Sequence, residues 1–268
     1  MGRLSRWLRR QPSDVNAILS FDEVVAALGR LGERELGLKT IPLDAVVGTV
    51  DRDRGPFDRR FRPRSSDTRD RWVRTAASLQ RGEGMEPISV YQVGDAYFVR
   101  DGHHRVSVAR AAGHFTIQAL VTEVRTTADA PADLRLTDLP VKTHERYFRE
   151  RVPLPPEGRA RVVLKNPQSY AELAEGVEAW GFRLIQERGD LLSREEVAEA
   201  WFRDEYLPAV TMLRETGLLP EGADETESYL RLTEARYNLL LTHGWDETVV
   251  RELRRKLRRK PSRRPPSE

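Results

Sequence analysis

The first part of the chain alternates between helical and strand-like spacing of its apolar positions. Ser20-Phe-Asp-Glu23 has the form of a capping box and precedes apolar residues at helical spacing, so we expect a helix over 20–31. β-branched residues in "KTIPLDAVVGTV" predict a strand over 45–50. Residues 51–66 hold Gly, Pro and many charges, which predicts a loop, and apolar spacing predicts a second helix over 67–80.

The stretch "EPISVYQVGDAYFVRDG" predicts a β-hairpin whose two-residue turn is Gly94-Asp95. A helix is expected over 104–112, with Gly113 as its C-cap, and "TIQALVTEV" predicts a further strand. Strands and helices follow one another without a repeating βαβ order. The pattern therefore predicts an α+β fold.

The second half of the chain is predicted to be mainly helical. Residues 126–158 are rich in Ala, Asp, Pro and Thr, which favours a linker with a short helix near 143–149, and "ARVVLKNP" is compatible with a short strand. Helices are expected from Asn166-Pro167 to Trp180, from the capping box at Ser193 to about Glu215 with a kink at Pro208, and over 224–242 and 245–260. The aromatic residues of this half are expected in its core: Trp201, Tyr206, Tyr229 and Tyr237.

Charge is distributed unevenly along the 268 residues. Residues 251–268 hold nine Lys/Arg against two Glu, residues 1–10 hold four Arg and no acid, and the remainder has 32 basic against 40 acidic residues. The basic tail could bind nucleic acid through charge, or it could be a solvated helix end. No apolar run approaches the roughly 18 residues that span a bilayer, so no membrane partner is expected. The absence of Cys excludes disulfides and thiolate chemistry and suits a cytoplasmic or nucleoid-associated location.

The candidate site is "VRDGHHRVSVARAAG". A strand leads into Gly102, which permits an unusual backbone angle, and a helix begins at His103 or His104. The first N–H groups of that helix and the cation of Arg105 favour an anion, most naturally phosphate. The alternative is a plain turn in which Arg105 pairs with an acid. No metal site is expected, because adjacent helical side chains diverge by about 100° and the chain has no Cys.

The stretch "ISVYQVGDAYFVRDGHHRVSVARAAG" resembles the core of the ParB/sulfiredoxin-like superfamily. The lead-in strand "IPLDAVVGTV" and the helix over 67–80 are also similar to that family, so the resemblance covers about residues 38–124. It implies a small mixed sheet with helices and a nucleotide, CTP or ATP with or without Mg²⁺, whose phosphates would contact Gly102, His103, His104 and Arg105. The second region is similar to an uncharacterised helical domain of actinobacterial and related bacterial proteins, a resemblance that implies no chemistry.

The chain departs from these families at several motifs. Partition proteins carry Glu-Arg-Arg after the glycine, where this chain has His-His-Arg, and their upstream arginine motif and helix-turn-helix DNA reader are not recognisable. Sulfiredoxins need a cysteine where this chain has His103, which excludes sulfinic-acid repair. The expected segments are an N-terminal helical arm over 1–37, a ParB/sulfiredoxin-like domain over 38–125, a linker over 126–158, a helical domain over 159–260 and a disordered basic tail over 261–268.

The loop "VDRDRGPFDRRFRPRSSD" interleaves arginines with phenylalanines. Arg59, Arg60, Arg62, Arg64 and Phe61 are candidates for contact with nucleic acid or a base, because arginine pairs with phosphate and phenylalanine stacks. The alternative is a solvated loop in which neighbouring aspartates neutralise the arginines. Asp44 and Asp51 are the nearest acids that could act as a base or hold Mg²⁺.

Three functions therefore compete. The first is a nucleotide-binding switch or NTPase in a regulatory or DNA-associated setting. The second is a small-molecule kinase of the serine type, in which Asp51 or Asp44 deprotonates the acceptor. The third is a DNA-binding protein that uses the arginine loop and the basic tail without turning over nucleotide. The candidate partners are nucleotide, DNA and a second copy of the chain.

Overall fold

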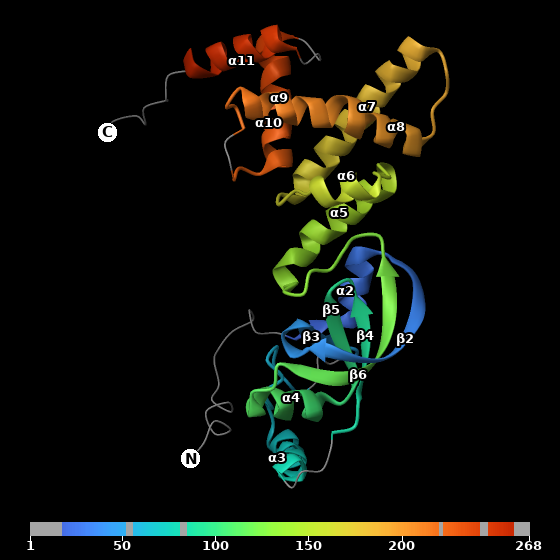
Figure 1. Cartoon of the computed structure of the whole chain (residues 1–268), viewed down its shortest axis with the longest axis vertical. Helices are drawn as coiled ribbons and strands as arrows, with labels where there is room; N and C mark the ends of the chain where they lie inside the picture. Colours follow the sequence, from blue (N-terminus) through green and yellow to red (C-terminus); the bar gives the residue numbers. More distant parts are fainter. Residues whose placement is uncertain (1–17, 52–55, 81–84, 220–221, 242–245, 260–268) are drawn as a thin grey trace, which may run out of the picture. The chain divides into compact units, whose positions relative to one another are not determined.

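A six-stranded sheet organises the N-terminal unit of the chain, which ends at Arg146, while the second unit begins at Tyr147. The computed structural model describes residues 18–51, 56–80, 85–219, 222–241 and 246–259 (Figure 1). The predictions for residues 1–17 and for the tail over 261–268 lie outside these ranges. In spatial order the strands are β1 (Leu19–Ser20), β3 (Val46–Thr49), β5 (Ala96–Asp101), β4 (Ile88–Val93), β6 (Thr116–Thr126) and β2 (Arg30–Pro42).

The sheet is mixed, and the chain belongs to the predicted α+β class. β4 pairs antiparallel with β5, and β2 with β6, while the pairs β1–β3, β3–β5 and β4–β6 are parallel. The predicted hairpin turn at Gly94-Asp95 is confirmed, as is the helix that ends at Gly113: α4 spans His103–Ala112, and Gly113 has φ 84°. The short 3-10 turns η2 (Leu43–Ala45) and η3 (Leu136–Asp138) lie in the connections.

Both faces of the sheet are covered. On one face, Val106 and Ala109 of α4 join strand residues and two loop residues, Phe57 and Phe61, in one buried cluster. The other face is covered by α2 (Phe21–Leu28) and by the segment from Ala128 to Leu134. The helix α3 (Ser66–Gln80) packs on α4 rather than on the sheet, and Trp72 and Val108 are buried between the two helices. The sheet and α3 thus hold α4 from two sides.

The N-terminal part differs from the predicted helical arm. α2 ends at Leu28 because Gly29 turns the chain with φ 75°, and residues 30–42 then pair along the whole of β6 as the strand β2. Ser20 makes no side-chain cap at this helix. The prediction of a helix over 20–31 was therefore too long, and the described part of residues 1–37 belongs to the sheet unit.

The predicted linker over 126–158 contains two helices, α5 (Leu139–Arg151) and α6 (Pro156–Arg161). The helix expected near 143–149 is thus longer than predicted, and its Phe148 packs a buried ring against Tyr170. The strand suggested by "ARVVLKNP" is absent: α6 occupies its start, and no strand includes residues 162–166. Val162 and Leu164 are buried, but the Leu164 N–H donates to the Tyr170 hydroxyl at 3.1 Å instead of to a partner strand.

Helices are the regular secondary structure of the described residues of the second unit, as predicted (Figure 1). α7 (Pro167–Arg188) runs past Trp180, where the sequence predicts its end, because Gly181 is buried inside the helix against Val197. The predicted helix from Ser193 is divided into α8 (Arg194–Ala200), a π-helical segment η4 (Trp201–Tyr206) and α9 (Leu207–Glu215). The wider π-helical turn ends two residues before Pro208, which has no N–H to donate to a regular helix.

Two further helices complete this unit, α10 (Glu225–Leu240) and α11 (Glu247–Arg259). The predicted core aromatics Trp201, Tyr206 and Tyr229 are buried and their rings contact one another, whereas Tyr237 is half exposed. Within the described ranges, no helix combines the length and the apolar character that crossing a membrane requires.

Candidate functional site

The candidate site lies where the central strand β5 passes into α4. Gly102 joins them with φ 104°, in the left-handed region, and as the N-cap residue it has no side chain that could cap the first turn of α4. A Cβ atom at Gly102 would lie 2.5 Å from Ile88 Cγ2, so the backbone needs glycine here for both angle and space. The first N–H groups of α4 have no partner within the helix, and the positive end of its dipole lies at the same point.

His103 is fixed against the end of the neighbouring strand β3. Its Nε2 lies 2.7 Å from Thr49 Oγ1 and 3.6 Å from an Asp51 carboxylate oxygen, and its side chain is only 13% exposed. The rings of Phe57 and Phe61 stack on its imidazole. Burial lowers the pKa of His103, and the nearby carboxylates of Asp51 and Asp101 oppose that shift only in part. The imidazole is therefore neutral at pH 7.

Arg105 is engaged within the protein, contrary to the expectation of a cation free for phosphate. Its guanidinium donates to the carbonyl of Pro87 at 2.8 Å, to that of Glu86 at 3.1 Å, and to the Asp101 carboxylate. These bonds tie the entry of β4 to the first turn of α4. The ion pair predicted by the alternative of a plain turn is thus present, and Arg105 acts here as a structural cation.

A cleft of about 810 Å³, here called the α4 cleft, opens over this first turn. It is lined by Gly102, His103, His104 and Arg105, by Asp51 and Phe57, and by Arg71 and Arg74 of α3, with Glu86 and Asp101 at the same cleft. Three arginines face three carboxylates, and Asp101 neutralises Arg105. Among the described residues, Arg71 and Arg74 have no carboxylate within ion-pair distance, so they supply unpaired positive charge to the cleft.

The positive charge of these two arginines affects the pKa of His104. Burial lowers its pKa, and the guanidinium groups of Arg71 and Arg74 lower it further, together with His103. Its Nδ1 is buried and, within the described part of the chain, has no hydrogen-bond partner. The sequence did not single out Arg71 and Arg74 as site residues. Their i, i+3 spacing places them on one face of the predicted helix over 67–80, but nothing local indicates that this face meets α4.

The arginine loop is more buried than predicted. Phe61 is fully buried and Arg62 nearly so, with the Arg62 Nε bound to the Asp58 carboxylate at 2.7 Å. Neither side chain therefore offers a surface to a base or a phosphate, which corrects that prediction for both residues. The Asp58 carboxylate also accepts the N–H groups of Arg60 and Arg62 and so closes the turn. Arg64 is exposed and lines none of the clefts described here.

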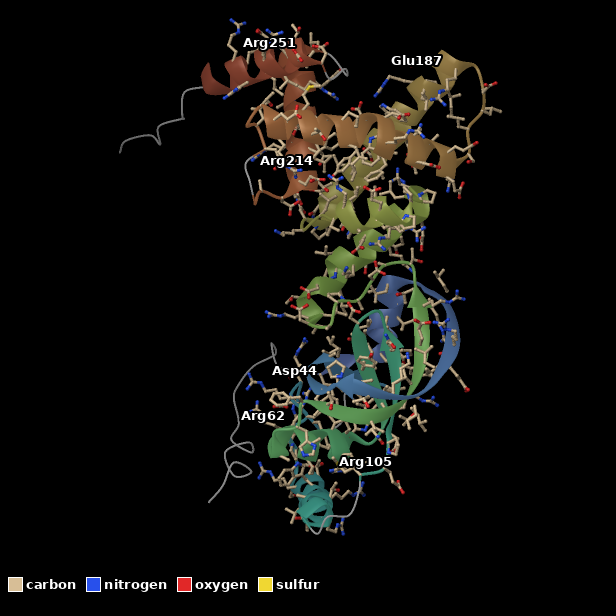
Figure 2. The ribbon with its side chains drawn as sticks, viewed as in Figure 1. Asp44, Arg62, Arg105, Glu187, Arg214 and Arg251 are labelled. Carbon is tan, nitrogen blue, oxygen red and sulfur yellow. The ribbon has the colours of Figure 1, made fainter. Side chains whose placement is uncertain are left out.

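The two candidate bases lie in different places. Asp51 lines the α4 cleft, whereas Asp44 lines a second cleft with Arg59, Arg60 and Arg110 (Figure 2 labels Asp44 and Arg105). Only Asp51 is therefore close to the expected phosphate position. No group of three His, Asp or Glu side chains suited to a metal ion occurs among the described residues, so a Mg²⁺ ion would need ligands from the nucleotide as well.

No family model matches the chain, and no curated protein sequence matches it.

Proposed function

We propose that the α4 cleft binds the phosphates of a nucleoside triphosphate. The observation that carries the proposal is the meeting of a helix N-terminus, whose N-cap is the glycine Gly102, with Arg71 and Arg74 in one cleft of about 810 Å³. Free N–H groups, a helix dipole and arginine forks all favour a multiply charged anion. The volume is within the range of small-molecule sites.

The nucleotide class comes from the resemblance to the ParB/sulfiredoxin-like superfamily, whose members hold CTP or ATP at this helix start. Asp51 supports a triphosphate with Mg²⁺ rather than a bare phosphate, because a single carboxylate and phosphate oxygens together form a common Mg²⁺ site. His103 and His104 would donate or accept one hydrogen bond each in their neutral forms. The resemblance also implies the setting, which we propose to be a regulatory or DNA-associated switch.

The test is a calorimetric titration with CTP and ATP, each with and without Mg²⁺. The double variant Arg71→Gln/Arg74→Gln should weaken binding at least tenfold, because each charge-assisted contact contributes about 1.5–3 kcal/mol. The matched control is Arg69→Gln/Arg125→Gln, which removes the same charge from two exposed positions outside the cleft. Equal affinity in both double variants would show that nucleotide does not use this cleft, and absence of binding to the wild type would refute the function.

A second candidate is transfer of the terminal phosphoryl group to a small hydroxyl compound such as free serine. The observation that favours it is Asp51, whose carboxylate borders the cleft 3.6 Å from His103 Nε2 and could accept the acceptor's proton. Asp51→Asn should retain ATP binding within a few-fold and lose phosphorylated product, as measured by mass spectrometry. Product formation by Asp51→Asn at the wild-type rate would exclude this role.

One observation supports the third candidate function, DNA binding. α11 exposes Arg251, Arg254 and Arg255 and buries Val250 and Leu253, so one side of the helix is basic. Affinity for duplex DNA should then fall steeply with salt and should weaken after deletion of residues 251–268. Unchanged affinity in the truncated chain would leave α11 and the tail without a role in DNA binding.

A further inference from the structure

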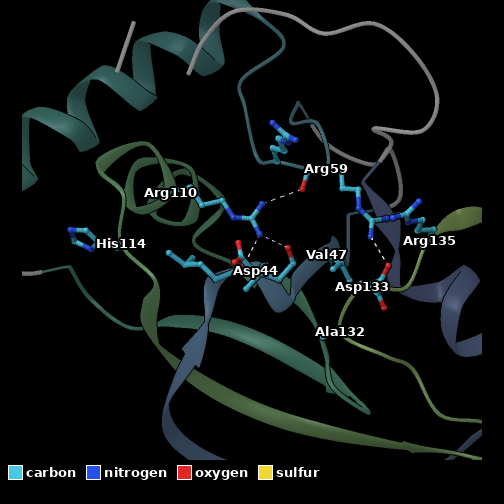
Figure 3. Close-up of a pocket in the computed structure, with 11 residues that line it drawn as sticks. Asp44, Val47, Arg59, Arg110, His114, Ala132, Asp133 and Arg135 are labelled. Atoms are coloured by element: carbon cyan, nitrogen blue, oxygen red, sulfur yellow. Dashed lines mark hydrogen bonds between the residues drawn. The ribbon is translucent and has the colours of Figure 1, made fainter. Parts of the chain in front are cut away.

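A second cleft of about 560 Å³ lies beside the later turns of α4, and we call it the Arg110 cleft. Its charged residues are Arg59, Arg60, Arg110 and Arg135 with Asp44 and Asp133 (Figure 3). Among the described residues, none lines both this cleft and the α4 cleft. It is therefore a separate candidate site of the same unit.

Two of the four arginines of this cleft are held by backbone carbonyl groups. Arg110 donates to the carbonyls of Leu43, Val46 and Arg59, the last two at 2.7 and 3.2 Å (Figure 3). Arg59 in turn donates to the carbonyls of Asp133 and Leu134. Carbonyl oxygens accept hydrogen bonds from the guanidinium N–H groups but do not neutralise the positive charge of the guanidinium. In the described part of the chain none of the four arginines has a carboxylate within ion-pair distance.

The charge in the cleft is thus undercompensated. Four arginines against two aspartates give a net charge of +2. Burial lowers the pKa of Arg110 to about 10, and although Asp44 and Asp58 raise it, Arg59 and Arg60 lower it further. The pKa of Arg59 is also lowered, by burial and then by Arg135, and the carboxylates of Asp138 and Asp133 oppose this shift only in part. Positive groups brought together at a cost are typical of a site that an anion completes.

The surroundings of the Arg110 guanidinium also favour an anion site. Its guanidinium lies over the ring of Phe61, 5.2 Å from the ring centre, and its Nε is buried without a hydrogen-bond partner among the described residues. Phe61 itself has φ 58°, a backbone conformation that side chains other than glycine rarely adopt. A costly conformation that positions an unneutralised arginine is the kind of strain that collects at binding sites.

We propose that the Arg110 cleft is a second anion site, which binds a small phosphorylated compound carrying about two negative charges. A phosphomonoester has a charge of about −1.5 to −2 at pH 7, which matches the excess charge. Arginine forks fit its oxygens in pairs. Arg60 and Arg135 are the most exposed of the four and would make the first contacts. The proposal does not depend on nucleotide binding in the α4 cleft.

The experiment isolates this cleft by using Arg71→Gln/Arg74→Gln as the background, so that the α4 cleft is disabled. Pyrophosphate and glycerol 3-phosphate are titrated into this variant by calorimetry, and phenylglyoxal modification of Arg60 and Arg135 is followed by peptide mass spectrometry. We expect saturable binding, protection of both arginines, and a loss of affinity of at least tenfold when Arg60→Gln/Arg135→Gln is added. The matched control adds Arg69→Gln/Arg125→Gln and should leave affinity within twofold.

Either of two results would overturn the proposal. One is the absence of binding of both probes in the background variant, and the other is equal loss of affinity in the Arg60/Arg135 and Arg69/Arg125 variants. Both results leave the nucleotide titration of the wild type unaffected, so failure here is distinguishable from failure of the proposed function. Circular dichroism of each variant checks that the exposed substitutions preserve the fold.

Discussion

Thr49 Oγ1 and His103 Nε2 lie 2.7 Å apart, although 54 residues separate them in the chain. The same hydroxyl accepts the N–H of Asp51 at 3.0 Å and is fully buried. Thr49 ends β3 and His103 begins α4, so one hydroxyl joins the end of a strand, the acid that follows it and the first turn of the helix. It is the link between the sheet and the candidate anion site.

Thr49→Val removes this hydroxyl with little change of shape. We expect a loss of about 1–3 kcal/mol of unfolding free energy, because the part-buried His103 Nε2 and Asp51 N–H both lose their partner. Thr49→Ser, which keeps the hydroxyl, should lose about 1 kcal/mol through its missing methyl group. Urea denaturation measures both variants. A Thr49→Val protein as stable as the wild type would show that His103 does not need this bond.

Gly102→Ala should destabilise the N-terminal unit by more than the strain of its backbone alone. A left-handed φ costs an alanine about 1–2 kcal/mol, and the new Cβ would also meet Ile88 at 2.5 Å. Gly37 offers a matched control, since it has φ 71° and a Cβ added there would meet no atom within 4 Å. Gly37→Ala should therefore show the strain without the clash. Equal losses in the two variants would contradict the close approach at Gly102.

Acid should destabilise the fold through the two histidines of α4. The pKa of both is lowered by burial from an ordinary value of 6.5, so below pH 6.5 the unfolded chain takes up protons that the folded chain resists. Stability is then fully present above about pH 6.5 and is lost as the pH falls, at no more than about 1.4 kcal/mol per pH unit for each histidine.

The check is urea denaturation of the wild type and of His103→Gln/His104→Gln between pH 7.5 and 5. The double variant should show a shallower dependence of unfolding free energy on pH over that interval. His114→Gln changes an exposed histidine and controls for the loss of an imidazole. An identical slope in the wild type and the double variant would contradict the lowered pKa values.

Local sequence signals predicted the turns and helix ends around the α4 cleft. The turn at Gly94-Asp95, the bend at Gly102 and the end of α4 at Gly113 all depend on a few adjacent residues, and the structure has each of them. The partners across the cleft are different. Arg71 and Arg74 reach it only because α3 packs on α4, and that packing rests on Trp72 and Val108, which are distant in the sequence.

Two residues of the arginine loop were wrongly predicted to contact nucleic acid, because the sequence does not show that they are buried. Phe61 and Arg62 have the composition of a nucleic-acid contact, but Asp58 closes the turn around them and the sheet core accepts the phenylalanine ring. The strand β2 was missed for a similar reason. Most of its residues are exposed and lack the alternation of a half-buried strand, so only its pairing with β6 defines it.

The second unit allows a sharp test of helix packing within α7. Gly181 is buried, and a Cβ there would lie 2.3 Å from Val197 Cγ1 of α8, whereas a Cβ at Gly176 of the same helix would meet nothing within 4 Å. Gly181→Ala should therefore cost about 1–3 kcal/mol through overpacking. Gly176→Ala should raise stability by about 0.5–1 kcal/mol, because alanine favours a helix interior.

Val197→Ala distinguishes a clash between these two side chains from a general intolerance of change at Gly181. Combined with Gly181→Ala, it removes both methyl groups that the new Cβ would meet. The double variant should then be less destabilised than the sum of the two single variants by about 1 kcal/mol or more, as a double-mutant cycle in urea would measure. Additive losses would mean that α7 and α8 do not meet at Gly181 in the way the structure has them.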